Sequence, residues 1–473
     1  MESPKYMINK DYKEINYRTK SYGDKGILLT ADNGRWILLT KEEYEKFVLA
    51  KLDKELFEKL ENALVIKTKN NTEKLIKNAE TYFWDITNST SLHILVPTLR
   101  CNHTCSYCYA FRKPEDAEGF DMSEDTAKKV VDFIFQGPAR NIVIEFTGGE
   151  PLAKFDIIKY VVLYAKEKNL VANKILDFAI VNNGSLLDEE KLQFIKENKI
   201  GLCFSLDGPK DLHDLNRKFT LEPKRSSYEM IMNVIEDTKK KYNRVFAIPV
   251  ITKASLSRYK EIIDLYVKLG FPSFRYKYIT DFGFATANWN HLAYGAEEFV
   301  EVWKKIVDYI LELNRKGIKI REEVSSILIQ KLLMGRNPGF AELACPCGAI
   351  DGQILYDYDG GIYSCDEART LGDDFKLGNV HNNTFYDLRN NKIRQVMKCN
   401  SSMLGFTCDA CPWYIYCGIC PLENYKKEGT MVVNLPNKNL RCMIHKEMIE
   451  TLFEKILFNR EERELLRKWP SFN

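Results

Sequence analysis

Short apolar segments alternate with amphipathic segments from Ser91 to about Thr280, and this alternation restricts the folds that the chain can adopt. The apolar segments have the length and β-branched content of buried strands, whereas the segments between them have helical periodicity. Repeated strand–helix units form a parallel sheet covered by helices, so a barrel-like α/β sheet is expected. The expected strands are LHILVP from Leu92, NIVIEF from Asn141, ILDFAIV from Ile175, GLCFSL from Gly201, VFAIPVI from Val245 and FRYKYI from Phe274.

One helix of this region can be placed by its capping residue. In SEDTAKKVVDFIF, Ser123 is expected to cap the helix N-terminus, and Val130, Val131 and Ile134 share one face. In parallel barrels the loops that follow the strands carry the chemistry. Functional residues are therefore expected directly after the strands.

The flanking segments are expected to form separate parts, because 473 residues are too many for one compact core. Before the barrel, the alternating segment GILLTADNGRWILL predicts a hairpin with its turn at Asp32, Asn33 and Gly34. The expected domains are an N-terminal α+β element (1–85), the barrel (86–285), a helical linker (286–344), a cysteine-rich domain (345–445) and a C-terminal helix (446–473).

Charge and hydropathy exclude several classes of partner. Lys and Arg number 69 against 66 Asp and Glu, so no attraction to nucleic acid or to an anionic membrane surface is expected. The N-terminus has no apolar core behind a basic start, and no apolar run is long enough to cross a bilayer. We therefore expect a cytoplasmic protein with a small or peptidic partner. In that reducing compartment, the 13 cysteines are interpreted as metal ligands rather than disulfides.

Three cysteines, Cys101, Cys105 and Cys108, follow the first expected strand in the segment CNHTCSYC. Three thiolates leave one iron of a four-iron cube without a protein ligand. A zinc site that lacks one ligand is the competing interpretation, but the paired two-residue knuckles typical of zinc are absent. His103 is a candidate fourth ligand, although a histidine on such a loop more often packs or forms a hydrogen bond.

The segment CNHTCSYC resembles the CxxxCxxC loop of the radical S-adenosylmethionine (SAM) superfamily, and the strands of the barrel agree with that family. The resemblance implies a partial (β/α)6 TIM-like radical SAM barrel. It also implies that Cys101, Cys105 and Cys108 hold a [4Fe–4S] cluster whose open iron binds the methionine part of SAM. Reductive cleavage of SAM, with electrons from an external low-potential donor, would then give the 5′-deoxyadenosyl radical.

The segment after the second expected strand, FTGGEPL, resembles the GGE motif of the same family. The resemblance implies that Gly148, Gly149 and Glu150 meet the amino group of SAM. Glycines permit close backbone approach, and a carboxylate complements an ammonium group. Tyr107, the aromatic residue before the third cysteine, is expected to pack beside the adenine.

Segments after the third and fourth expected strands complete the resemblance. NNG at 182–184 is similar to the turn that contacts the ribose, with Asn183 as the expected contact. SLDGPKDLHDLNR is similar to the family's SxDGP…HDxxR segment, which implies that Ser205 and Arg217 bind ribose or carboxylate oxygens. A surface ion pair between Arg217 and Asp214 is an equally weighted alternative, and Asp207 is interpreted as part of a turn.

A second group of cysteines runs from Cys345 to Cys442 and resembles the SPASM domain. The resemblance implies two auxiliary [4Fe–4S] clusters and hence three clusters in the chain. Two departures in spacing leave open whether Cys345 and Cys347 both ligate, and a zinc ribbon is the alternative. Cys203 is interpreted as core packing, and Cys399 has no assignment. The resemblance assigns Cys345, Cys347, Cys365 and Cys420 to the first auxiliary cluster and Cys408, Cys411, Cys417 and Cys442 to the second.

Asp366 follows Cys365 directly. In related maturases an acidic residue at this position removes a proton from the substrate, so the resemblance implies that Asp366 is a general base. Proton removal would prevent charge from accumulating when a carbon radical is oxidised in a buried site. Glu367 is the rival for this role.

Enzymes of the SPASM type mostly modify ribosomally made peptides, so the resemblance implies a maturase that cross-links a precursor peptide oxidatively. CGAIDGQILYDYDGGIYSCDEAR and CGICPLENYKKEG are similar to maturases of His-Xaa-Ser peptide systems. The N-terminal element resembles a winged-helix-like leader-binding domain, with a structural cap as the alternative. Two further hypotheses stay open: a dehydrogenase of the sulfatase-maturing or alcohol-oxidising kind, and a non-catalytic iron–sulfur or zinc scaffold.

Overall fold

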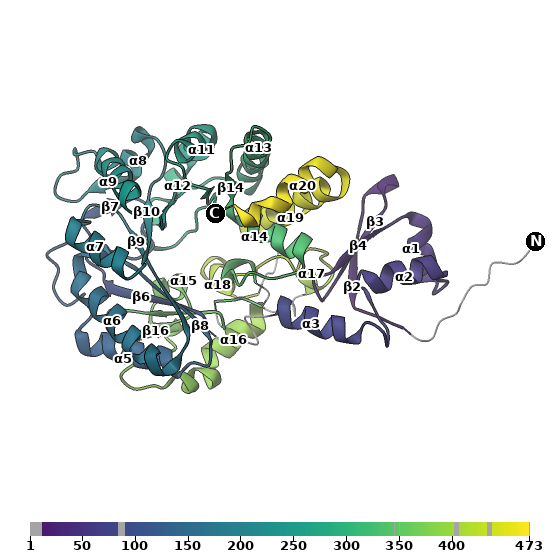
Figure 1. The fold of residues 1–473 in the computed structure, drawn as a ribbon, viewed down its shortest axis with the longest axis horizontal. Helices are drawn as coiled ribbons and strands as arrows, with labels where there is room; N and C mark the ends of the chain where they lie inside the picture. Colours follow the sequence, from purple (N-terminus) through teal and green to yellow (C-terminus); the bar gives the residue numbers. More distant parts are fainter. Residues whose placement is uncertain are drawn as a thin grey trace, which may run out of the picture.

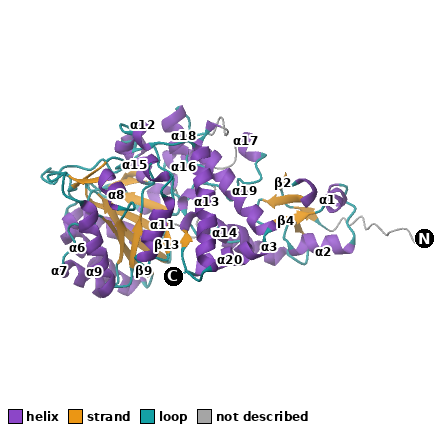
Figure 2. Cartoon of the chain, turned by 90° about the horizontal axis from the view of Figure 1, so that it is seen from above, coloured by secondary structure: helices purple, strands orange, loops and turns teal. Residues whose placement is uncertain are grey.

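The computed structural model of the chain describes residues 12–83, 90–344, 346–349, 351–401, 406–432 and 438–472. An N-terminal element lies at one end of the long axis, and a helix-covered sheet lies at the other (Figure 1). The cysteine-rich region and the C-terminal helices lie between them, an arrangement that Figure 2 shows from above. No helix among the described residues combines the length and the apolar character that a membrane span requires.

The central sheet is built from parallel strands in the order in which they occur along the chain. The predicted α/β barrel is confirmed for these strands, and helices cover the outer face of the sheet. The strands are β6 (Leu92–Thr98), β8 (Asn141–Gly148), β9 (Ile175–Asn182), β10 (Gly201–Ser205) and β12 (Val245–Ile248). The helices between them are α5 (Glu124–Gln136), α6 (Phe155–Ala172), α7 (Glu189–Glu197), α8 (Lys210–Asn216) and α9 (Ser227–Lys241), and α11 (Tyr259–Lys268) follows β12.

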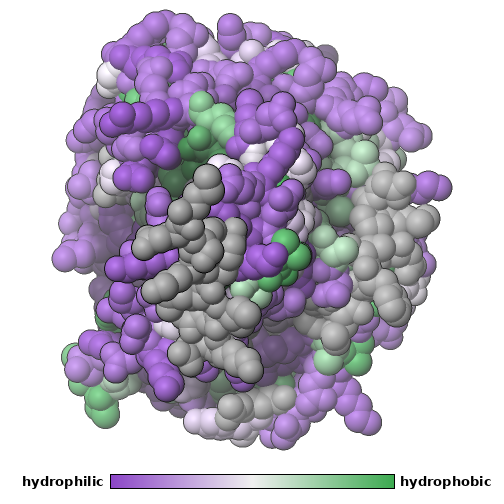
Figure 3. Space-filling model, turned by 90° about the vertical axis from the view of Figure 1, so that its right-hand side faces the viewer, coloured by the Kyte–Doolittle hydropathy of each residue, from purple (hydrophilic) through white to green (hydrophobic). Residues whose placement is uncertain are grey.

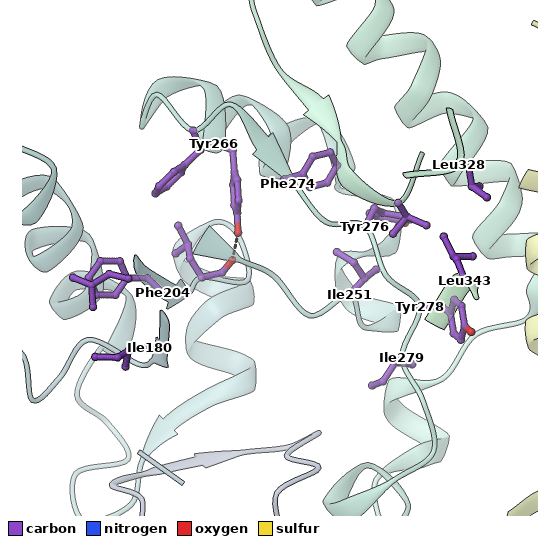
Figure 4. Close-up of a cluster of buried hydrophobic side chains, with 14 of the residues drawn as sticks. Ile180, Phe204, Ile251, Tyr266, Phe274, Tyr276, Tyr278, Ile279, Leu328 and Leu343 are labelled. Carbon is purple, nitrogen blue, oxygen red and sulfur yellow. Dashed lines mark hydrogen bonds between the residues drawn. The ribbon is translucent and has the colours of Figure 1, made fainter. Parts of the chain in front are cut away.

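Helix α5 begins where the sequence predicts. The Ser123 hydroxyl accepts a hydrogen bond from the Thr126 amide at 3.1 Å and caps the helix. Val130, Val131 and Ile134 are buried in the same core cluster as the outward-facing residues of β8. The core continues past β10, where Tyr266 donates to the Leu206 carbonyl at 2.8 Å (Figure 4). Apolar periodicity therefore predicted the buried face of this helix correctly.

The sixth expected strand, from Phe274, is much shorter than predicted. Only Ser273–Phe274 (β13) is extended, and it pairs with β14 (Arg321–Glu322) rather than with β12. The Tyr276 amide donates to the Glu322 carboxylate at 3.1 Å, beside the N-terminus of α14 (Glu323–Met334). A side-chain acceptor thus takes the place of a strand partner for this backbone group.

The opposite edge of the sheet is extended by the cysteine-rich region. Strand β15 (Gln353–Tyr356) pairs in parallel with β6, and β16 (Gly361–Tyr363) and β17 (Gly378–Asn379) follow antiparallel. Ile94 of β6 is buried in one cluster with Cys365, which lies just after β16. The first barrel strand and the second cysteine group therefore share a core.

The N-terminal element contains a three-stranded antiparallel sheet and its own apolar core. The predicted hairpin is confirmed, because the Gly34 amide donates to the Ala31 carbonyl at 2.9 Å and Gly34 has φ +76°. The elements are β1 (Lys13–Glu14), β2 (Tyr17–Ser21), β3 (Ile27–Ala31), β4 (Trp36–Leu39), α1 (Lys41–Val48), α2 (Lys54–Asn62), β5 (Ile66–Lys67) and α3 (Thr72–Tyr82).

This element packs directly on the cysteine-rich region. The Thr30 hydroxyl donates to the Pro412 carbonyl at 2.8 Å, and the Tyr82 hydroxyl donates to the Ile415 carbonyl at 3.0 Å. The Trp36 indole donates to the Leu332 carbonyl of α14 at 2.6 Å.

Hydrophilic side chains dominate the end of the molecule seen in Figure 3.

The remaining helices surround the cysteine-rich region. Helix α19 begins at Leu440, so the boundary expected at residue 446 falls inside a helix. These helices are α13 (Ala296–Arg315), α15 (Asp366–Thr370), α16 (Lys392–Ser401), α17 (Phe406–Asp409), α18 (Pro421–Glu428), α19 (Leu440–Phe458) and α20 (Arg460–Lys468).

Candidate active site

The three cysteines of the first loop converge at the C-terminal end of β6. Strand β7 (His103–Cys105) pairs antiparallel with β11 (Arg217–Phe219), which fixes the middle of the loop. Burial raises the pKa of Cys101 well above its usual value, and the neighbouring thiols of Cys105 and Cys108 raise it further. Burial also raises the pKa of Cys105 to about 12, although Arg217 opposes this shift. The loop therefore brings three thiols into mutual electrostatic contact.

His103 connects this loop to the segment after β9. Its Nδ1 lies 2.8 Å from the Asn183 side-chain nitrogen, and its ring packs on Phe219 with centroids 4.4 Å apart. Burial lowers the pKa of His103 to about 3, so the ring is neutral at pH 7. These contacts agree with a packing and hydrogen-bonding role for His103. They also bring Asn183, a predicted site residue, next to the cysteine loop.

Glu150 of the GGE motif is buried beside the same loop. Its carboxylate accepts hydrogen bonds from the Leu152 amide at 3.1 Å and the Asn183 amide at 2.8 Å. Burial raises its pKa to about 7, and these two amides oppose the shift. The carboxylate has backbone partners and no cationic partner among the described residues, so it can take an ammonium group.

Gly148 and Gly149 let the backbone pass close to the cysteine loop. Gly148 has φ +119°, and a side chain there would press on Val96. A Cβ on Gly149 would collide with the Arg100 carbonyl. Any larger residue would therefore displace the start of the loop. The backbone of the motif thus approaches the loop closely, as the sequence predicts.

Arg217 is buried and pairs with Asp207. Its Nε lies 3.1 Å from the Asp207 carboxylate, its Nη1 lies 3.9 Å from the Cys105 sulfur, and its guanidinium lies 5.3 Å from the centre of the Tyr107 ring. The alternative surface pair with Asp214 is wrong, because the Asp214 carboxylate instead accepts from the Tyr228 amide at 2.8 Å.

Asp207 is the functional residue that sequence reasoning missed. It is fully buried, and it accepts hydrogen bonds from the Tyr107 hydroxyl, Asn216 (3.2 Å), Arg217 (3.1 Å) and the Val250 amide (3.1 Å). It therefore orients two predicted SAM-site residues at once, where the sequence indicated only a turn. The sequence did contain one indication of a functional role, because this aspartate directly follows an expected buried strand.

Replacing Asp207 by Asn is expected to destabilise the protein strongly. The variant keeps the shape but leaves the buried Arg217 without its counter-charge, which typically costs about 3–5 kcal/mol. Urea unfolding measures the loss. Asp214→Asn is the matched control at a half-buried helix-capping carboxylate, for which about 1 kcal/mol or less is expected. Equal losses in the two variants would contradict the role of Asp207.

Cys203 lies in the middle of β10 and Ser205 at its end, on one face of the strand. Both are partly exposed, whereas Leu202 and Phe204 on the other face are buried. Burial nevertheless raises the pKa of Cys203 to about 12, so this thiol is largely enclosed. Ser205 is placed at the strand end, level with Ile248 of β12.

The second cysteine group divides into two sets of thiols. Cys347 and Cys420 both raise the pKa of the buried Cys365, after burial itself. Cys411 and Cys408 likewise raise the pKa of Cys442, which burial and these thiols bring to about 11. Each set contains three of the four cysteines that the resemblance assigns to one auxiliary cluster.

The other cysteines of this region are Cys417, Cys399 and Cys345. The Cys417 sulfur lies 3.5 Å from His445 Nδ1, one turn beyond Cys442 on α19. Cys399 is exposed on α16, and Cys345 lies outside the described residues. No three His, Cys, Asp or Glu side chains of the described part of the chain converge on a single-ion site.

Asp366 begins α15 and lies close to the first cysteine loop. Arg369 of this helix donates to the Ala110 carbonyl at 3.0 Å and pairs with Asp357 at 2.9 Å. Burial raises the pKa of Asp366 to about 7, helped by the nearby carboxylates of Glu367 and Glu145. The two cysteine loops are thus joined directly by the helix that carries this carboxylate.

Tyr109 lies between Asp366 and the first cysteine group. Asp366, Glu145 and Cys108 all raise the pKa of Tyr109, after burial, and its hydroxyl lies 3.3 Å from the Thr147 hydroxyl. The residue is nevertheless 40% exposed. Tyr109 is therefore accessible close to Asp366 and Glu145, and the sequence did not identify it.

Comparison with known proteins identifies the barrel region. A radical SAM superfamily model matches residues 95–266. The chain carries a radical SAM domain. The cysteine-type anaerobic sulfatase-maturating enzyme of Clostridium novyi (strain NT) is 25% identical over 382 residues, which cover 78% of this chain and 97% of that protein. The serine-type enzyme of Bacteroides thetaiotaomicron is 24% identical over 348 residues, covering 69% and 81%.

Solved structures agree with this radical SAM fold. Native anSMEcpe with bound AdoMet has a TM-score of 0.67 at 21% identity and covers 79% of this chain and 100% of its own. Streptococcus suis SuiB bound to S-adenosylmethionine has a TM-score of 0.54 at 15% identity, covering 89% and 98%. The chain shares the fold of these structures, and its C-terminal cysteine-rich region fits a SPASM domain.

The radical SAM domain implies a [4Fe–4S] cluster and SAM, and the residues present fit both. The first loop supplies three converging thiols, which suit a four-iron cluster with one open iron. Glu150 supplies a buried carboxylate whose described hydrogen-bond partners are backbone amides, which suits the ammonium group of SAM.

Proposed function

We propose that this chain is a peptide maturase that removes a side-chain hydrogen from a ribosomally made peptide and forms an oxidative cross-link. The supporting observation is the position of Asp366: Arg369 ties its helix to Ala110 of the first cysteine loop at 3.0 Å. A proton acceptor and a radical-generating loop therefore border the same space. When bound, SAM and its cluster supply the radical that takes the hydrogen atom, and auxiliary clusters accept the electron that is released on oxidation.

The proposed roles of the first site follow from its contacts. Cys101, Cys105 and Cys108 hold the cluster, while Gly148, Gly149 and Glu150 receive the methionine amino group. Asn183 and Ser205 face the ribose, Tyr107 packs beside the adenine, and Arg217 binds a carboxylate or ribose oxygen. Asp207 is a positioning residue for Tyr107 and Arg217.

Asp366 is proposed to accept the proton that oxidation releases. The substrate loses one hydrogen atom, then one electron and one proton, so the cross-linked product has two hydrogens fewer. The carboxylate is buried close to Tyr109 and Glu145, where a released proton has little access to water. Glu367, one residue further along α15, is the alternative acceptor.

The N-terminal element is proposed to bind the leader of a precursor peptide. The solved sulfatase-maturating structure covers 79% of this chain, whereas SuiB bound to precursor peptide SuiA covers 89%, at a TM-score of 0.53. The element also contacts the cysteine-rich region through Thr30 and Tyr82. This extra coverage supports the precursor-peptide hypothesis over a sulfatase substrate.

A sulfatase-maturing dehydrogenase is the second candidate, because the Clostridium novyi relative is matched over 97% of its length. The decisive experiment incubates the reconstituted enzyme anaerobically with SAM, a reductant and the peptide encoded by a short open reading frame beside the gene. Both candidates predict the loss of two hydrogens. A cross-link suppresses backbone fragments within the ring, whereas a dehydrogenated side chain leaves them intact. An unchanged peptide mass would contradict the peptide maturase.

Anaerobic reconstitution is expected to load about twelve irons per chain, since the thiols can hold three four-iron clusters. Replacing Cys347, Cys365 and Cys420 together by Ala should lower this by about four irons, because these thiols converge on one site. Iron and zinc are measured on the same preparation. About four irons accompanied by zinc would overturn the auxiliary-cluster assignment.

A further inference from the structure

The inner face of the barrel sheet stays partly exposed. This face comprises the side chains that are directed away from the covering helices. On β8, Ile144 and Phe146 are buried, whereas Val143 and Glu145 are not. Strand register aligns Glu145 with Ile94 of β6, which packs beside Cys365. The inner face therefore opens toward the space between the first cysteine loop and the auxiliary cysteines.

Glu145 is the charged residue of this face that lacks a partner. The structure gives its carboxylate no hydrogen bond and no ion pair with any described residue. It is nevertheless largely enclosed, because burial raises its own pKa. It lies near Asp366, Tyr109 and Cys203, whose pKa values it raises. A carboxylate that is largely enclosed by protein, and that forms no hydrogen bond or ion pair with a described residue, is less well solvated than one at the surface. Such a group is stabilised when a ligand brings the missing charge.

The cations around the inner face are already paired. Arg275 binds Glu323 at 2.9 Å, and Lys277 binds Glu342 at 2.5 Å. Arg441, further toward the cysteine-rich region, binds Glu423 at 2.9 Å. Burial raises the pKa of Glu145, and Arg275 opposes this shift from within its ion pair with Glu323. The inner face therefore carries unmatched negative charge at Glu145, near the carboxylate of Asp366.

We propose that Glu145 determines substrate specificity by pairing with a Lys or Arg side chain of the peptide, next to the residue that is modified. The inference rests on the proposed function, because it needs a peptide inside the barrel. Electrostatic pairing in a buried site selects partners strongly, since an unpaired or like charge there is costly. Acidic peptides would be rejected at the same position.

The test uses the full chain, reconstituted anaerobically with SAM, and a pool of synthetic peptides with randomised central positions. Mass spectrometry gives the composition of the peptides that remain bound and of those that lose hydrogen. The wild-type enzyme should enrich Lys and Arg over Asp and Glu roughly tenfold or more at one position. Glu145→Gln should abolish the preference, and Glu145→Arg should reverse it. Glu167→Arg, an exposed change on the outer side of α6, is the control and should keep the wild-type preference.

Three outcomes would overturn this inference. The first is a Glu145→Gln variant that retains the wild-type preference. The second is a wild-type enzyme that binds and modifies peptides without selecting basic residues. In both cases the proposed peptide maturase stands. If no peptide of any composition is bound or modified, the proposed function fails together with the inference. The Gln variant is close in shape to Glu, so it keeps the test valid even where the Arg variant does not fold.

Discussion

An enzyme in which Cys101, Cys105 and Cys108 are all replaced by Ala is expected to form no 5′-deoxyadenosine. These thiols converge at the end of β6 beside Glu150, where the carboxylate can hold the SAM amino group. Without them no iron is held open to SAM, although the other thiol sets remain. Anaerobic incubation with SAM and dithionite, followed by chromatography and mass spectrometry, measures the nucleoside. Iron content should fall by about four per chain.

Cys203→Ala is the matched control for this triple change. Cys203 lies on β10, outside the three converging sets of thiols, so its variant should keep full iron content and full SAM cleavage. Continued formation of 5′-deoxyadenosine by the triple variant would contradict the assignment of the first loop. Loss of all iron, with unfolding, would instead indicate that the loop is needed for the fold.

Replacing Asp366 by Asn is expected to separate SAM cleavage from product formation. Neither SAM binding nor radical formation needs this carboxylate, so 5′-deoxyadenosine should still appear. Modified peptide should fall by roughly a hundredfold or more, which is the usual scale for losing a general base. Iron content, 5′-deoxyadenosine and modified peptide are measured on one preparation. The Asn side chain fits the same buried position at the start of α15.

Glu367→Gln distinguishes the two acidic residues of α15. It should retain product formation if Asp366 is the base, because Glu367 then has no part in proton removal. A fall in product only in the Gln variant would move the role to Glu367. Parallel loss of iron, SAM cleavage and product in Asp366→Asn would mean that the carboxylate supports the cluster region rather than the chemistry.

Much of the fold was predictable because its information is local. Strands begin at Leu92, Asn141 and Ile175 where apolar, β-branched segments begin. The hairpin turn ending at Gly34 and the cap at Ser123 depend on a few adjacent residues. Such local patterns determine the backbone conformation of their own segment, so the conformation can be predicted without knowledge of tertiary contacts.

Much of the candidate site was predictable for a related reason. The C-terminal ends of parallel strands meet at one edge, so residues that directly follow different strands come together. The hydrogen bond from the Asn183 amide to Glu150, and the contact of Asn183 with His103, are the result. Chain spacing thus predicted which segments meet there.

The sequence by itself determined the barrel strands, the spacing of the cysteines and the motifs at the strand ends, and only the tertiary structure decided how the parts are joined. It paired Arg217 with Asp207 instead of Asp214, placed β15 against β6, and left Glu145 without an ion pair among the described residues. These outcomes depend on which strand edges and which buried charges meet across long stretches of chain. Because a charge is buried at a cost set by its neighbours in space, residue order alone does not specify its partner.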